Sequence, residues 1–205
     1  MVSKLGKKSG ILGAAAALAA APVLAATMTA QAAPQPAPAP APQALLSCDL
    51  SGKAEFSPAL SVNPAGASTQ MKVSGEATGC EGQSKRQDGV VSAKFSGALE
   101  GQMSCTSLPR DVGGDVEITW TYEDGSTKTS TADFNLNMEG DLTNPSEPVT
   151  GAFTGSTTDG EFAEAKHEGK AKIDPSSVAG GCAGGAITGS GLESMAFDGT
   201  YEMTK

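Results

Sequence analysis

The chain has 205 residues, a length within reach of one domain, and only 4% of them are aromatic, so its core has few large side chains available. Its formal net charge of −9 argues against binding to nucleic acid or anionic membranes, because both require lysine or arginine to neutralise phosphate. The 26 glycines indicate many turns or close backbone approaches.

Residues 1–32 have the pattern of a secretory signal peptide. Lysines near the start precede an uncharged run from residue 11 to residue 30, rich in alanine and leucine, and then the small-x-small sequence Ala30-Gln31-Ala32. This order predicts export and cleavage before Ala33. A retained membrane anchor is the alternative for a run of this length, but alanine is a poor membrane residue and Pro22 interrupts the run.

Residues 33–45 are rich in alternating alanine and proline and precede the expected folded domain, residues 46–205. Proline favours an extended polyproline helix, which predicts a semi-rigid spacer. Leu45-Leu46-Ser47-Cys48 is similar to the motif before the lipid-modified cysteine of bacterial lipoproteins. Here, however, the spacer separates the motif from the hydrophobic run, and lipidation would leave an odd number of cysteines. We therefore expect Cys48 to be paired.

Alternation of apolar and polar residues is the main structural signal after the spacer. From Val91 to Cys105 every odd position holds an apolar residue or glycine, and nearly every even position is polar. A period of two is typical of a strand with one buried face and one solvent-exposed face. The other alternating segments lie at residues 48–56, 71–77, 116–122, 132–138, 149–153, 163–173 and 195–203.

Asp-Gly turns support the same interpretation. Residues 123–126 and 158–161 each place Asp-Gly between two alternating runs, and Asp-Gly adopts the positive φ of a tight hairpin at low cost. No capped segment of helical period follows the signal peptide. The sequence predicts an all-β domain, a single antiparallel sandwich or barrel of about eight or nine strands. Glycines at inward positions indicate coiled strands and would leave space inside a barrel.

The nine aromatic residues are spread along the predicted strands. Most have inward parity, which predicts about one core anchor per strand. A sugar-binding platform would need two or three aromatic residues facing solvent. Only Phe162 breaks the inward parity of its segment, so the pattern favours the core.

Four cysteines in an exported chain predict two disulfides. Cys48 begins the first predicted strand and Cys80 ends the second, so a hairpin brings them together and leaves Cys105 for Cys182. The parity of Cys80 is off by one residue, which a bulge at Gly79 would correct. Metal-binding thiolates are the alternative, but no closely spaced cysteine pair supports them.

Short motifs surround these cysteines. They are the opening Cys48-Asp49-Leu50-Ser51-Gly52-Lys53-Ala54-Glu55-Phe56-Ser57-Pro58-Ala59-Leu60, then Gly79-Cys80, Ser104-Cys105-Thr106, Trp120, Gly160-Glu161-Phe162, and Cys182 with Ile187-Thr188-Gly189-Ser190-Gly191. Together, over about residues 46–203, they resemble a group of small secreted four-cysteine β proteins from high-GC Gram-positive bacteria. The resemblance implies an exported β domain and lends no catalytic residue. Glu161 and Glu164 depart from it, because the relatives tend to be uncharged there.

Candidates for catalysis or metal binding are few. His167 is the single histidine and could act as a general base, but its inward parity favours a hydrogen-bonded or rim position. Gly189-Ser190-Gly191 lacks the outer glycines and the following helix of a nucleophile elbow. Asp111 and Asp115, beside two glycines, would form at best a loose calcium site.

Carboxylates are abundant enough for an acid/base pair of the kind that glycosidases use. On the segment 163–173, however, Glu164 and Glu168 alternate with lysines on one predicted face, a pattern typical of a solvated strand. We therefore expect no enzymatic activity, no catalytic residue, no cofactor and no metal.

We expect a secreted, non-enzymatic interaction module for an unknown extracellular partner, acting through loops near residues 57–70, 106–114 and 174–185. We expect no nucleic acid partner, and no membrane association after signal removal. The alternatives are a binder of a small apolar ligand inside a barrel and, third, a carboxylate-based hydrolase. An interior cavity on the order of several hundred Å³ would favour the ligand binder, and a filled core would favour the surface module.

Overall fold

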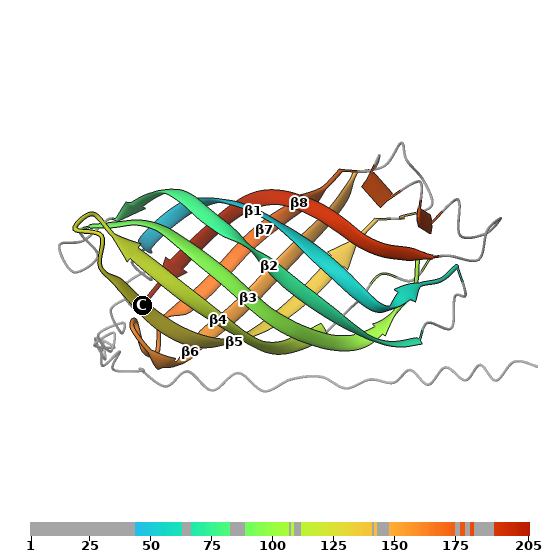
Figure 1. Ribbon diagram of the computed structural model, residues 1–205, viewed down its shortest axis with the longest axis horizontal. Helices are drawn as coiled ribbons and strands as arrows, with labels where there is room; N and C mark the ends of the chain where they lie inside the picture. The colour runs from blue at the N-terminus through green and yellow to red at the C-terminus, as the bar shows by residue number, and fades with distance from the viewer. Residues whose placement is uncertain are drawn as a thin grey trace, which may run out of the picture. The chain divides into compact units, whose positions relative to one another are not determined.

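The structure is a computed structural model that describes residues 44–62, 67–82, 89–106, 108, 112–140, 142, 148–174, 177–178, 181–182 and 191–205. The predicted signal peptide and the spacer up to residue 43 lie outside these residues. The described chain forms one closed antiparallel barrel of eight strands (Figure 1), in which each strand pairs with the next in sequence and β8 closes on β1. The all-β prediction is confirmed, and of its two forms the barrel is the one present.

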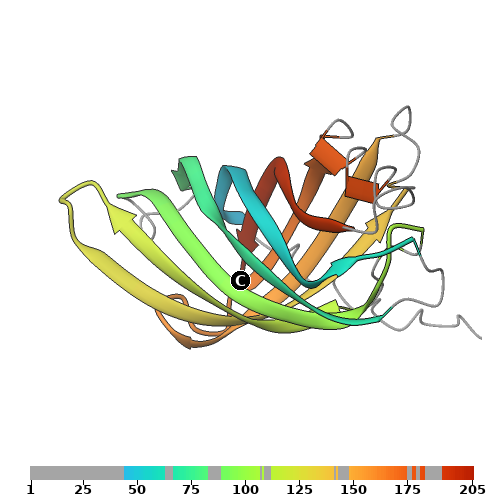
Figure 2. The same cartoon turned by 45° about the vertical axis from the view of Figure 1, so that its right-hand side comes forward.

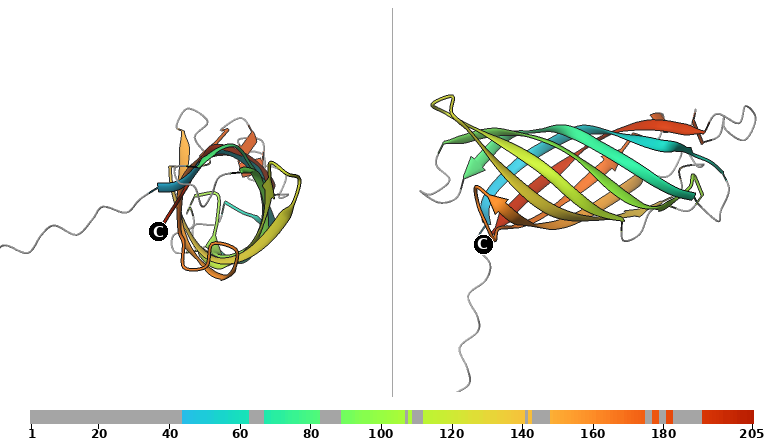
Figure 3. Two further views of the ribbon diagram at one scale, coloured as in Figure 1. Left: turned by 90° about the vertical axis from the view of Figure 1, so that its left-hand side faces the viewer. Right: turned by 60° about the horizontal axis from the view of Figure 1, so that its bottom comes forward.

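The strands are long and run obliquely around the barrel (Figures 1 and 2). Seen along the axis they form a ring (Figure 3). Such tilt is required to close eight strands into a barrel. Their bounds are β1 (Ala44–Leu60), β2 (Ala67–Gly82), β3 (Val90–Met103), β4 (Val112–Tyr122), β5 (Thr127–Glu139), β6 (Val149–Gly160), β7 (Lys166–Ile173) and β8 (Leu192–Thr204).

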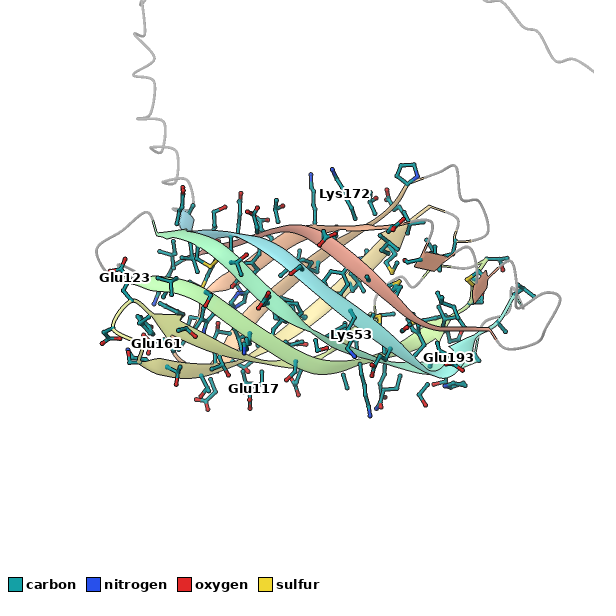
Figure 4. All side chains as sticks on the ribbon, turned by 45° about the horizontal axis from the view of Figure 1, so that its top comes forward. Lys53, Glu117, Glu123, Glu161, Lys172 and Glu193 are labelled. Carbon is teal, nitrogen blue, oxygen red and sulfur yellow. A yellow bond between two sulfur atoms is a disulfide. The ribbon has the colours of Figure 1, made fainter. Side chains whose placement is uncertain are left out.

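The two-residue alternation places apolar side chains inside the barrel and charged side chains outside. Figure 4 shows Lys53, Glu117 and Lys172 projecting from the outer surface. On β3 the expected inward parity of the odd positions holds only from Ala93 onward. The β3–β4 register shifts between Val90 and Ser92, so Val90 is buried and Val91, expected inside, is 40% exposed.

Phenylalanine rings cover several of the inward glycines. The pairs lie directly opposite each other on neighbouring strands: Gly52 with Phe197, Gly75 with Phe95, Gly155 with Phe134, and Gly169 with Phe153. A Cβ atom on Gly52 would lie only 2.7 Å from Cζ of Phe197. The expectation that inward glycines leave space is therefore wrong at these positions, because the glycines admit rings from the next strand.

The disulfide Cys48–Cys80 joins β1 to β2 near the end of the barrel where the first strand begins. The β1–β2 register shifts between Ser47 and Asp49, and Gly79 has a φ of 60°. The expected bulge at Gly79 is thus present, and it brings Cys80 opposite Cys48. We call this end of the barrel the Ala44 end.

The opposite end, which we call the Leu60 end, carries the second disulfide, Cys105–Cys182. Cys105 follows β3, and its backbone N–H donates to the carbonyl oxygen of Ser61 at 2.8 Å. Cys182 lies in the connection from β7 to β8 and is fully buried. Buried apolar side chains around the bridge, among them Leu60, Val178 and Leu192, extend the core to this end.

Candidate functional site

A cavity of about 110 Å³ lies inside the barrel. All eight strands contribute to its wall, and every atom that faces it is apolar. The four phenylalanines that cover glycines all line it, and Gly151 on β6 lines it without a covering ring. A Cβ atom on Gly151 would lie 3.4 Å from Cδ1 of Leu136, which is ordinary van der Waals contact. Gly151 therefore leaves usable space, as expected of an inward glycine.

Two residues of the wall carry polar groups, and the first is Trp120. Its ring is fully buried, and its Nε1–H donates to Oγ of Ser130 on the neighbouring strand at 2.8 Å. The Ser130 hydroxyl in turn donates to the backbone carbonyl of Glu161. The indole N–H is thus satisfied away from the cavity.

The second such residue is Tyr201, whose hydroxyl lies 2.6 Å from Nδ1 of His167. His167 pairs with Gly155 in the β6–β7 ladder, so Thr157, two residues along β6, shares the inward face. Nε2 of His167 lies 2.7 Å from Oγ1 of Thr157. His167 thus joins hydroxyl groups from the strands on both sides of it.

Burial keeps the His167 imidazole neutral. The side chain is 1% exposed, and its ring packs near those of Phe134 and Tyr201. This burial, with a smaller contribution from the charge of Lys166, lowers the pKa of His167 from 6.5 to about 4. Burial also raises the pKa of Tyr201. His167 thus occupies a hydrogen-bonded interior position, and both ring nitrogens face hydroxyls rather than a carboxylate.

The turn between β6 and β7 is tied to the β4–β5 hairpin at the Ala44 end. The Glu161 carboxylate accepts hydrogen bonds from the Tyr122 hydroxyl at 3.2 Å and from Nζ of Lys128 at 3.1 Å. Burial, together with the negative charge of Glu161, raises the pKa of Tyr122 to about 12. Figure 4 shows Glu161 and Glu123 at the same end of the barrel.

Phe162 lies in this turn and not in a strand, because β7 begins only at Lys166. Its ring packs edge-on against Trp120, with 5.1 Å between the ring centroids. Phe162 and Glu164 both have positive φ, 57° and 70°. The parity break at Phe162 therefore reflects a turn that folds over Trp120, and Glu164 does not share a strand face with Glu168 as expected.

The remaining sequence candidates do not come together. Asp115 lies on the outer face of β4, opposite Asp133 of β5, so the position considered for a loose calcium site is a regular strand there. Asp111 and Ser190 lie outside the described residues. In the described segments, no group of three or more histidine, cysteine or acidic side chains is placed to hold a metal ion.

A hollow on the outer surface lies where β1 and β8 separate. The β1–β8 register shifts between Glu55 and Leu60, and the hollow is lined by residues 55–59 together with Glu193 and Ser194. Two carboxylates thus border it, as a hydrolase would need. The Glu55 carboxylate, however, pairs with Nζ of Lys53 at 2.6 Å, which lowers its pKa. A general acid requires the opposite shift.

Two polar residues of the cavity region, Ser130 and Thr157, were missed from the sequence. Ser130 and Thr157 accompany apolar residues at inward parity, so a polar residue at a core position was the signal that could have found them. Gly151 has the same parity as the ring-covered glycines. What sets it apart is that a Cβ atom there would meet nothing closer than 3.4 Å, which depends on the register of the strands.

No helix in the described part of the chain is long and apolar enough to cross a membrane. Comparisons with protein-family models, with curated proteins and with solved structures find no match for this chain. The fold and the contacts inside the barrel therefore carry the functional argument. They define a disulfide-stabilised β-barrel with an apolar interior cavity.

Proposed function

We propose that the protein is a non-enzymatic extracellular binding protein that holds a small apolar molecule inside its barrel. The observation that carries this proposal is the cavity, whose wall comes from all eight strands and exposes no polar atom. Transfer of an apolar molecule from water into such a space is favourable, because it removes apolar surface from water.

The size of the cavity limits the ligand. Its volume of about 110 Å³ lies below the roughly 300–1,000 Å³ of pockets for drug-sized molecules. It lies near the roughly 150 Å³ of an engineered apolar cavity that binds benzene or xenon. The interior is thus neither filled nor as large as several hundred Å³, and a single ring or a short hydrocarbon is the matching ligand. Met71, Met138 and Met195 in the wall can adapt to its shape.

The extracellular location is supported by the two disulfides, which indicate an oxidising compartment. The predicted signal peptide agrees with it. The surface-module hypothesis relied on loops that lie partly outside the described residues, including 63–66 and 183–190. No observation in the described chain favours that hypothesis over the cavity.

Titration calorimetry with toluene tests the proposal. Wild-type protein should bind one toluene per chain, and Gly151→Val should weaken binding about tenfold or more, since its added carbons occupy the space beside Leu136. Ala152→Val is the matched control, because residue 152 is exposed on the outer side of the same strand. The absence of saturable binding to wild type, or equal binding to Gly151→Val, would contradict the proposal.

A further inference from the structure

The polar groups of the cavity wall are all engaged outside the cavity. Trp120 donates its indole N–H to Ser130, and the Tyr201 hydroxyl is bonded to His167. Within the described chain, no buried side-chain nitrogen or oxygen lacks a hydrogen-bond partner. A ligand in the cavity therefore meets only ring and alkyl carbon atoms of the wall.

The direction of the hydrogen bond between Tyr201 and His167 depends on the tautomer of the imidazole. A neutral imidazole has one donor and one acceptor nitrogen. We assign the ring proton to Nε2, so that Nε2 donates to Thr157 and Nδ1 accepts from the phenol, which is the stronger donor of the two hydroxyls. In this arrangement Tyr201 has no proton left for a ligand.

We infer that the cavity selects molecules without any hydrogen-bonding group, and that His167 is a specificity-determining residue because it takes up the one hydroxyl proton at the cavity wall. The inference rests on the proposed function. A polar ligand atom would lose its bonds to water and find no partner inside, and leaving such a group unpaired is unfavourable.

Toluene and phenol provide the test, because they have nearly the same shape and differ by a methyl group in place of a hydroxyl. Binding can be followed by calorimetry and by the emission of Trp120, the single tryptophan of the chain and part of the cavity wall. Wild-type protein should bind toluene about tenfold or more tightly than phenol. Equal or tighter binding of phenol would overturn the inference and leave the proposed function intact. If neither compound binds, both fail.

Two variants test the role of His167. His167→Phe keeps a ring beside Phe134 but frees the Tyr201 hydroxyl. The affinity for phenol should therefore rise about tenfold relative to the affinity for toluene. The double variant His167→Phe/Tyr201→Phe removes that hydroxyl and should restore the wild-type preference. An unchanged preference in His167→Phe would remove His167 from the specificity argument. Should this variant fail to fold, His167→Leu serves in its place, and the wild-type comparison still decides the selectivity.

Discussion

At the residue scale, glycine has two different roles on the inner face of the barrel. Gly52 lies under the ring of Phe197, and its own strand approaches the backbone oxygen of Ser74 closely. Gly151 has neither constraint, since a Cβ atom added there would meet only side-chain carbons, at 3.4 Å and beyond. The same residue type thus allows close packing at one position and borders empty space at the other.

Alanine substitutions should separate these two roles. Gly52→Ala should lower the free energy of unfolding by about 1–3 kcal/mol, because its Cβ would lie 2.7 Å from both the Phe197 ring and the Ser74 oxygen. Gly151→Ala should be neutral or stabilising, because it adds van der Waals contacts in free space. Urea unfolding of the two variants measures the difference. Equal losses would show that the two glycines have the same surroundings.

His167 makes stability depend on pH. The unfolded chain binds a proton at this residue below a pH of about 6.5, whereas the folded chain does so only below about 4. Between these values the unfolded state holds more protons, so the free energy of unfolding falls as the pH is lowered. The loss reaches about 3 kcal/mol at most.

His167→Phe should lack this contribution. Between a pH of about 7 and a pH of about 4.5, the wild type should lose about 2 kcal/mol more unfolding free energy than the variant. The carboxylates titrate in both proteins, so their contributions to the pH dependence cancel in the comparison. Urea unfolding at the two pH values provides the measurement. Identical losses would mean that His167 is charged or solvated in the folded protein.

At the element scale, the sequence largely predicted which residues of each strand face inward, but it did not predict that the sheet closes into a barrel. The alternation of residues 116–122 and 132–138 predicted β4 and β5, and the turn signal between them was also correct. A sandwich and a barrel have the same parity, so the pairing of β8 with β1 could not be predicted. The predicted start of β7, at residue 163, was wrong because the turn at Phe162 adopts positive φ without a glycine.

The two disulfides fasten different elements, and their removal should have unequal effects. Cys105–Cys182 spans 77 positions and is buried at both ends, whereas Cys48–Cys80 spans 32 and joins strands that are already paired. In the chain-entropy model the bridges contribute roughly 4.5 and 3.7 kcal/mol. Cys105→Ala/Cys182→Ala should therefore melt at a lower temperature than Cys48→Ala/Cys80→Ala in a calorimetric scan. The reverse order would show that the Leu60 end holds together without its bridge.

At the scale of the whole molecule, the cavity exists because the inward side chains do not fill the interior of the barrel. Eight tilted strands fix the width of the interior, and the four phenylalanine rings that lie against glycines of the neighbouring strands leave part of it empty. Apolar content and parity were visible in the sequence. The empty volume depends on distances across the barrel and on which glycine lies opposite which ring, so it required the structure.

The central claim, an apolar cavity that accepts a small apolar guest, is tested most directly by a crystal structure of the wild-type protein under xenon pressure. Xenon has no hydrogen-bonding group and fits apolar cavities of this size. We predict one xenon atom inside the barrel near Gly151, Met138 and Phe153, which all line the cavity, and its loss in Gly151→Val. A filled interior without xenon in the wild-type crystal would contradict the account.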